Sequence, residues 1–142
     1  MRSGFEKKMS VDEILKNAKS VAIVGLSPDE SKASNMVARY LLQNGFKIYP
    51  VYPKEDEILG LKVYRNLSQI SEPIDIAVMF RKGEFAQILI DEVIRKSVLT
   101  LWLQLGIVNE AAKLKARQNG VNFVQDKCIK IEFERLKNGI TK

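Results

Sequence analysis

Short runs of apolar residues alternate along the chain with longer segments in which apolar residues recur every three or four positions. Residues 21–24 form the first run, which is apolar throughout and ends at Gly25. A run with apolar side chains on both faces is typical of a strand covered on two sides. This pattern predicts five main strands, over residues 21–24, 46–51, 75–80, 98–103 and 121–124.

The segments between these runs have helical spacing, with apolar side chains on one face. Ser10, followed three residues later by Glu13, is a capping-box pattern that marks the start of a helix. Gly45 and Gly120 each come directly after another helical segment, at the position where a left-handed C-terminal cap belongs. We predict helices over residues 11–18, 34–44, 109–119 and 129–136, and a further helical face at Phe85, Ile88, Leu89 and Val93.

Strands that alternate with helices predict an α/β fold, because each helix returns the chain to the start of the next parallel strand. We expect one domain over residues 1–142, with a three-layer, Rossmann-like, doubly wound parallel sheet of about five strands in the order 3-2-1-4-5. Ligands of such sheets bind at the carboxyl ends of the strands. The candidate loops are therefore residues 25–34, 52–60, 80–83, 104–109 and 125–128.

Composition limits the chemistry available to the chain. The sequence of 142 residues has no histidine and only one cysteine, Cys128. These counts exclude Ser-His and Cys-His nucleophile pairs, imidazole metal sites and a thiolate zinc site within one chain. The longest apolar run, residues 76–80, is far shorter than the roughly 20 residues of a membrane span. No secretory leader is recognisable, so the expected location is the cytoplasm.

The net charge of +6 favours an anionic partner. The lysines and arginines are scattered, however, and form no basic stripe interleaved with aromatic residues. The pattern therefore favours a small polyanionic ligand over nucleic acid.

The first strand-end loop, residues 25–34, contains the groups of a phosphate cradle. Gly25 permits a sharp turn and a close approach of the backbone to a ligand. Lys32 supplies positive charge, and the following helix N-terminus supplies free amides. Three hydroxyls are also available, although Ser31 or Ser34 could instead cap the helix: Ser27, Ser31 and Ser34.

The second loop argues against NAD as the ligand. A sheet that binds NAD places an acidic residue at the end of its second strand, where it contacts the ribose hydroxyls. Here Lys54 precedes the first acids, Glu55 and Asp56. A lysine at this position suits a phosphate better than a ribose diol.

Taken in series, the motifs resemble a known family. They are Gly25-x-Ser27, Lys32-x-Ser34, Tyr49-Pro50-Val51-x-Pro53, Ile58-x-Gly60, the runs 75–81 and 101–106, and Asp126-Lys127-Cys128 with Glu132. This series, spread over residues 10–136, resembles the small stand-alone CoA-binding domain family. It is more distantly similar to the CoA-binding domain of the succinyl-CoA synthetase alpha subunit.

The resemblance implies that the chain binds coenzyme A or an acyl-CoA and has no catalytic activity of its own. It places Gly25, Ser27, Lys32 and Ser34 around the pyrophosphate and Lys54 near a phosphate of the nucleotide. The full set of predicted ligand-binding residues is Gly25, Leu26, Ser27, Ser31, Lys32, Ser34, Tyr52, Lys54, Phe80, Arg81 and Gln104.

Three positions depart from the pattern of the relatives. Lys32 replaces the usual arginine and so loses its planar fork. Tyr52 replaces an asparagine, and we hypothesise that its ring lies against the adenine. Phe133 replaces a common histidine, so any role of that side chain is absent here.

Several candidates have a structural interpretation beside the functional one. Arg81 follows a buried strand and suits a phosphate contact, with a surface ion pair as the alternative. Phe80 and Trp102 suit the core, whereas Gln104 must find polar partners in the backbone or a ligand. Cys128 could exchange disulfides with the CoA thiol, but a half-buried structural residue is the favoured interpretation.

Two rival functions remain open. One is an NAD(P)-dependent oxidoreductase that uses the same crevice, and the other is a nucleotide-binding subunit of a larger enzyme. The preferred interpretation is a CoA-binding module that takes a small-molecule ligand. The sequence does not reveal the oligomeric state, and a homo-oligomer and a partner subunit both stay open.

Overall fold

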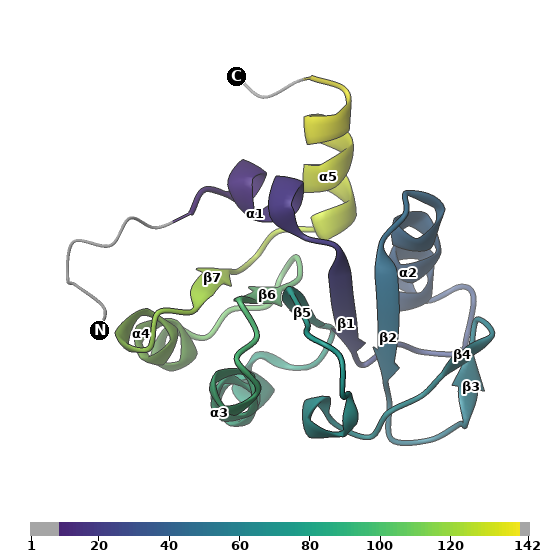
Figure 1. The fold of residues 1–142 in the computed structure, drawn as a ribbon, viewed down its shortest axis with the longest axis horizontal. Helices are drawn as coiled ribbons and strands as arrows, with labels where there is room; N and C mark the ends of the chain where they lie inside the picture. The colour runs from purple at the N-terminus through teal and green to yellow at the C-terminus, as the bar shows by residue number, and fades with distance from the viewer. Residues whose placement is uncertain (1–8, 140–142) are drawn as a thin grey trace.

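The computed structural model describes residues 9–139, and its centre is a five-stranded parallel sheet (Figure 1). Every pairing within this sheet is parallel, which confirms the predicted class. From one edge to the other, the strands are β2 (Lys47–Val51), β1 (Ser20–Val24), β5 (Ile76–Met79), β6 (Thr100–Leu103) and β7 (Asn122–Val124).

Helices cover both faces of the sheet and bury a separate apolar core on each. One core contains Trp102, which is fully buried beneath α1 (Val11–Asn17), α2 (Ala33–Gln43) and α5 (Ile129–Lys137). The other contains Met79, also fully buried, beneath α3 (Ala86–Lys96) and α4 (Glu110–Gln118). Ser10 and Glu13 form the predicted capping box at the start of α1.

The strand order corrects one prediction. Numbered along the chain, the five strands of the sheet lie in the order 2-1-3-4-5 instead of 3-2-1-4-5, because β5 pairs with β1 and leaves β2 at the edge. Pro50 gives the physical reason, since proline has no N–H to donate and is restricted to edge strands. The point where the strand order reverses therefore lies between β1 and β5, and ligands bind at that point in such sheets.

The connection from β2 to β5 has no long crossover helix. It contains a small antiparallel hairpin, β3 (Glu57–Ile58) and β4 (Leu61–Lys62), and a short 3-10 helix, Leu67–Gln69. Between them, Tyr64 pairs with the outer edge of β2, where its N–H donates to the Pro50 carbonyl at 2.9 Å. This pairing holds the backbone at Tyr64 alongside β2.

Tyr40, on α2, carries the one buried side-chain polar atom that lacks a hydrogen-bond partner among the described residues. Burial, followed by the negative charge of Glu134, raises the pKa of its hydroxyl. Because a buried hydroxyl without a partner costs about 1–3 kcal/mol, we expect Tyr40→Phe to raise the free energy of unfolding by about 1 kcal/mol. Urea denaturation would measure the change. A loss of stability would mean that the hydroxyl does have a partner, such as a bound water.

Candidate functional site

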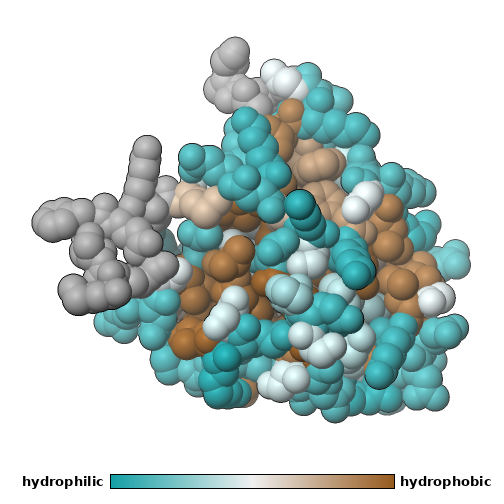
Figure 2. All heavy atoms as spheres, viewed as in Figure 1, coloured by the Kyte–Doolittle hydropathy of each residue, from teal (hydrophilic) through white to brown (hydrophobic). Residues whose placement is uncertain are grey.

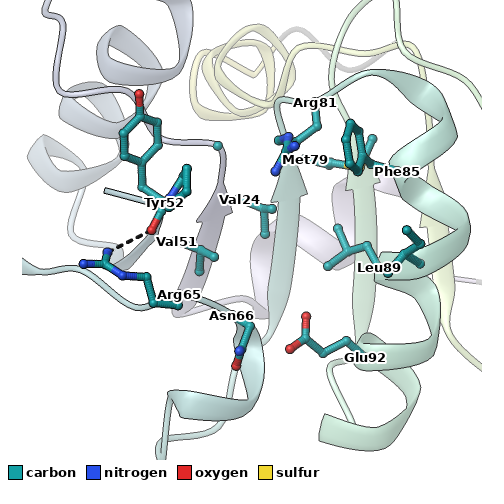
Figure 3. Close-up of a pocket in the computed structure, with 13 residues that line it drawn as sticks. Val24, Val51, Tyr52, Arg65, Asn66, Met79, Arg81, Phe85, Leu89 and Glu92 are labelled. Atoms are coloured by element: carbon teal, nitrogen blue, oxygen red, sulfur yellow. Dashed lines mark hydrogen bonds between the residues drawn. The ribbon is translucent and has the colours of Figure 1, made fainter. Parts of the chain in front are cut away.

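A cleft opens at the carboxyl ends of β1, β2 and β5, next to the point where the strand order reverses (Figure 3). Its volume is about 170 Å³. The apolar part of its lining includes Val24, Val51, Met79 and Leu89. The polar and charged part consists of Arg65, Asn66, Arg81 and Glu92.

Gly25 forms the turn at the end of β1, where the ends of three strands converge. Its N–H donates to the Val51 carbonyl at 2.8 Å, and its φ of +91° lies in the left-handed region that favours glycine. A Cβ at this position would stand 2.8 Å from the Phe80 carbonyl oxygen. Only glycine fits this approach without a shift of the backbone.

Side chains in the first turn of α2 hold the loop after Gly25 in place through hydrogen bonds. Ser34 lies within the helix instead of capping it, and its hydroxyl accepts a hydrogen bond from the Ser27 N–H at 3.0 Å. Asn35, almost fully buried, donates to the Ser27 carbonyl at 2.9 Å. Asn35 in turn accepts from Arg39 at 2.8 Å. Sequence reasoning missed Asn35, whose only signal is a polar residue on the buried face of the helix.

Asp29 organises the exposed tip of the same loop. Its carboxylate accepts from the Ser31 N–H at 2.9 Å and from the Ser31 hydroxyl at 2.7 Å. Hydrogen bonds from Ser31, with a smaller contribution from the Lys32 charge, hold the pKa of the Asp29 carboxyl below its usual range. The Ser31 hydroxyl thus has a partner inside the loop, and the Lys32 side chain is exposed.

Arg65 fixes the shape of the second loop, a role that the sequence did not predict. One guanidinium nitrogen, Nη1, donates to the carbonyls of Tyr52, Lys54 and Glu55 at 3.0, 3.1 and 2.9 Å. The other, Nη2, lies 3.8 Å from the Asp56 carboxylate. Figure 3 shows Arg65 beside Tyr52 at the edge of the cleft. Lys54 is thereby held on an exposed turn of defined shape.

Arg81 lies at the mouth of the cleft, two residues after the end of β5. Its guanidinium carbon is 3.9 Å from the centroid of the Phe85 ring, a cation–π contact that orients the side chain (Figure 3). No carboxylate in the described part of the chain forms an ion pair with Arg81. The Arg81 side chain is exposed, so its charge is accessible to a ligand.

Gln104 and Trp102 bind the backbone that leads into α5. The Gln104 side-chain oxygen accepts from the Ile129 N–H at 2.8 Å, and only 5% of the residue is exposed. The Trp102 indole donates to the Lys127 carbonyl at 2.9 Å. Cys128, between these two anchoring points, is partly buried and packs against the core.

These contacts predict that Gln104 serves stability and not ligand binding. Gln104→Met would remove the acceptor and leave the buried Ile129 N–H unpaired, at a cost of about 1–3 kcal/mol. We therefore expect the variant to melt at a lower temperature and to keep an unchanged affinity for coenzyme A, the expected ligand. Calorimetric titration of the folded variant would reveal a ligand contact if the affinity fell instead.

The structure separates the eleven predicted ligand-binding residues into three groups. Gly25, Tyr52 and Arg81 line the cleft. Leu26, Phe80 and Gln104 pack in the interior or at its margin. Four of the remaining five lie on the two loops beside the cleft: Ser27, Ser31, Lys32 and Lys54. The fifth, Ser34, lies buried in the first turn of α2.

The partly buried Tyr52 packs against the core on the α2 side, although it borders the cleft.

No cluster of His, Cys, Asp and Glu residues that could hold a metal ion occurs among residues 9–139. Within the same residues, no helix is long and apolar enough to cross a membrane.

Comparison with known proteins decides the family. A family model described as a CoA binding domain matches residues 19–134, most of the chain. The chain belongs to the CoA-binding domain family. The uncharacterized protein YneT of Bacillus subtilis, a similar protein of nearly the same length, is 36% identical over 124 residues, which are 87% of this chain and 92% of YneT.

Larger proteins contain the same CoA-binding domain as a small part. ADP-forming acetate–CoA ligase I of Archaeoglobus fulgidus is 31% identical over an alignment 123 positions long, gaps included, which covers 78% of this chain but 18% of the ligase. Among solved structures, a hypothetical protein from Pyrococcus horikoshii superposes with a TM-score of 0.86 at 35% identity and covers 89% of both chains. The dinucleotide-forming acetyl-coenzyme A synthetase 1 of Ca. Korarchaeum cryptofilum gives 0.71 at 27% identity, covering 80% of this chain and 27% of that one.

Proposed function

We propose that this chain binds coenzyme A, or an acyl-CoA, at the carboxyl edge of its sheet. The observation that carries the proposal is the cleft between the ends of β1, β2 and β5, at the strand reversal of a CoA-binding domain. This is where doubly wound sheets bind nucleotides. The adjoining loops offer Lys32, Lys54 and Arg81, which are exposed cations suited to the phosphates of the ligand.

The two loops that carry Lys32 and Lys54 beside the cleft have a shape that is fixed before any ligand binds, which supports the proposal. Arg65 holds the turn that carries Lys54, and Asn35 with Ser34 holds the loop that carries Lys32. Preorganised groups lose little conformational freedom on binding. At about 170 Å³ the cleft holds only part of a molecule the size of CoA, so the rest would extend over these loops.

The proposed role is that of a binding module, which carries or senses CoA or supplies it to a partner subunit. In the similar ligase of A. fulgidus, the match to this chain covers only 18% of the length. The rest of such a ligase is available to carry out its reaction. We expect no turnover of CoA by the isolated chain.

Thermal melting of the purified chain, freed of copurified ligand, tests the proposal with four ligands: CoA, 3′-dephospho-CoA, NAD and NADP. A ligand at about 100 times its dissociation constant stabilises the folded state by roughly 2.7 kcal/mol. We expect the largest shift with CoA, and a smaller one with 3′-dephospho-CoA if a lysine contacts the 3′-phosphate. A shift with NAD or NADP alone would instead favour an oxidoreductase.

Neutralising Lys32 or Arg81 should weaken CoA binding about tenfold each, equivalent to about 1.4 kcal/mol. Each exposed cation would lose a charge-assisted hydrogen bond to a phosphate. Lys32→Met and Arg81→Met retain much of the aliphatic stem, and Lys113→Met on α4 serves as the control. Calorimetric titration measures the affinities. Unchanged binding in both site variants would place the ligand elsewhere.

A further inference from the structure

A second hollow lies at the amino ends of β1 and β2, the opposite edge of the sheet from the cleft that Gly25 and Arg81 line. Its volume is about 660 Å³, within the range of about 300–1,000 Å³ typical of small-molecule sites. It lies between the end of α1, the turn from α2 into β2 and the second half of α5. Figure 2 shows a strip of apolar surface over α5, bordered by hydrophilic residues.

The floor of this hollow is apolar and firmly packed. Leu15, Phe46, Phe133 and Leu136 contribute the apolar side chains. The Phe46 and Phe133 rings meet edge to face with their centroids 5.1 Å apart. Phe133 also meets Tyr40 edge to face at 6.3 Å. Rings locked in this way form a preformed apolar surface that a hydrocarbon chain can cover.

The rim is strongly basic. Lys16, Lys19, Lys47 and Lys137 surround the floor, and no Asp or Glu occurs among the described residues that line the hollow. Within the described part of the chain, none of the four lysines forms an ion pair. Lys137 donates to the Asn44 side chain at 2.8 Å, a neutral partner that leaves its positive charge uncompensated.

We propose that this hollow binds an anionic amphiphile, a molecule with one hydrocarbon chain and a carboxylate or phosphate head group. The chain would cover the phenylalanine and leucine floor, and the head group would meet two or more of the rim lysines. Charge complementarity selects the anion, because the rim offers four cations and no anion. A flat bilayer surface fits a concave site poorly, so the occupant is a single molecule. The proposal is independent of CoA binding.

Backbone amide shifts in ¹⁵N–¹H spectra test the proposal directly, with decanoate as probe and decyltrimethylammonium as the matched cation, both below micelle formation. We expect decanoate to shift residues 15–19, 44–47 and 133–137 in a saturable manner, and the cation to cause no such shifts. Decyl phosphate should act like decanoate. Equal effects of both charges, shifts centred on residues 25–34 and 80–81, or no shifts at low millimolar concentration would each overturn the proposal.

Charge reversal on the rim provides the second test. The double variant Lys16→Glu, Lys47→Glu should weaken decanoate binding at least about tenfold, the loss expected from roughly 1.4 kcal/mol. Lys113→Glu, on the opposite face, should leave it unchanged. CoA affinity should be unaffected in both proteins, which separates this proposal from the proposed function. Binding of the chain only to phosphatidylglycerol vesicles, and not to free decanoate, would refute a single-molecule site.

Discussion

Replacing Gly25 with alanine should lower the free energy of unfolding by about 2–4 kcal/mol and weaken CoA binding in the protein that still folds. The left-handed backbone conformation alone costs a residue with a Cβ about 1–2 kcal/mol. The new Cβ would also stand 2.8 Å from the Phe80 carbonyl oxygen, so the ends of β1 and β5 would have to separate. That separation occurs at the cleft, which Gly25 lines.

Gly45→Ala is the matched control for this substitution. Gly45 has nearly the same φ, +89°, but nothing lies within 4 Å of the position that its Cβ would occupy. Its replacement should therefore cost only the conformational part and leave CoA affinity unchanged. Urea denaturation and calorimetric titration of both variants make the comparison. Equal losses of stability would show that the contact with the Phe80 carbonyl has no energetic weight.

Trp102→Ala should cause a larger loss of stability, about 3–5 kcal/mol, the usual cost of removing a buried tryptophan from a core. The side chain is fully buried beneath α1, α2 and α5, and its indole holds the Lys127 carbonyl just before α5. Truncation leaves both a cavity and a carbonyl without its donor. Thermal and urea unfolding monitored by circular dichroism would measure the loss.

Two further variants separate the contributions of Trp102. Trp102→Phe keeps most of the volume but removes the indole donor, so it should cost clearly less than alanine. Ile88→Ala, at a residue that is 71% exposed, should cost less than about 0.5 kcal/mol. A loss for Trp102→Ala as small as that for Ile88→Ala would contradict the close packing of Trp102 beneath the three helices.

The five strands of the main sheet and the five α-helices of the described residues were predictable because their apolar residues recur with regular spacing. The strand order was not, because hydrophobic pattern fixes which residues are buried but not which strands are neighbours. Pro50 was the available signal, since a proline in the middle of a strand predicts an edge position. The segment from Tyr52 to Asp75 lacks a long helix and gave no periodic signal of its own.

The position of the candidate site followed from the strand ends, and Gly25, Tyr52 and Arg81 line the cleft there. The residues that shape the loops were harder to find. Arg65 reaches carbonyls 10 to 13 positions away across a hairpin, a contact that no local spacing encodes. Gln104 was correctly expected to need polar partners, but only the fold reveals that the backbone of α5 supplies one.

The pairing of Tyr64 with β2 has a consequence for how molecules of this protein can associate. An exposed sheet edge invites another strand to add to it, and this route leads to aggregation. Here Pro50 has no N–H to offer to another strand, and its carbonyl already accepts a hydrogen bond from the Tyr64 N–H. At the other edge β7 is only three residues long. Growth of the sheet from copy to copy is therefore disfavoured at both edges, and we expect any oligomer to form through its helices or loops.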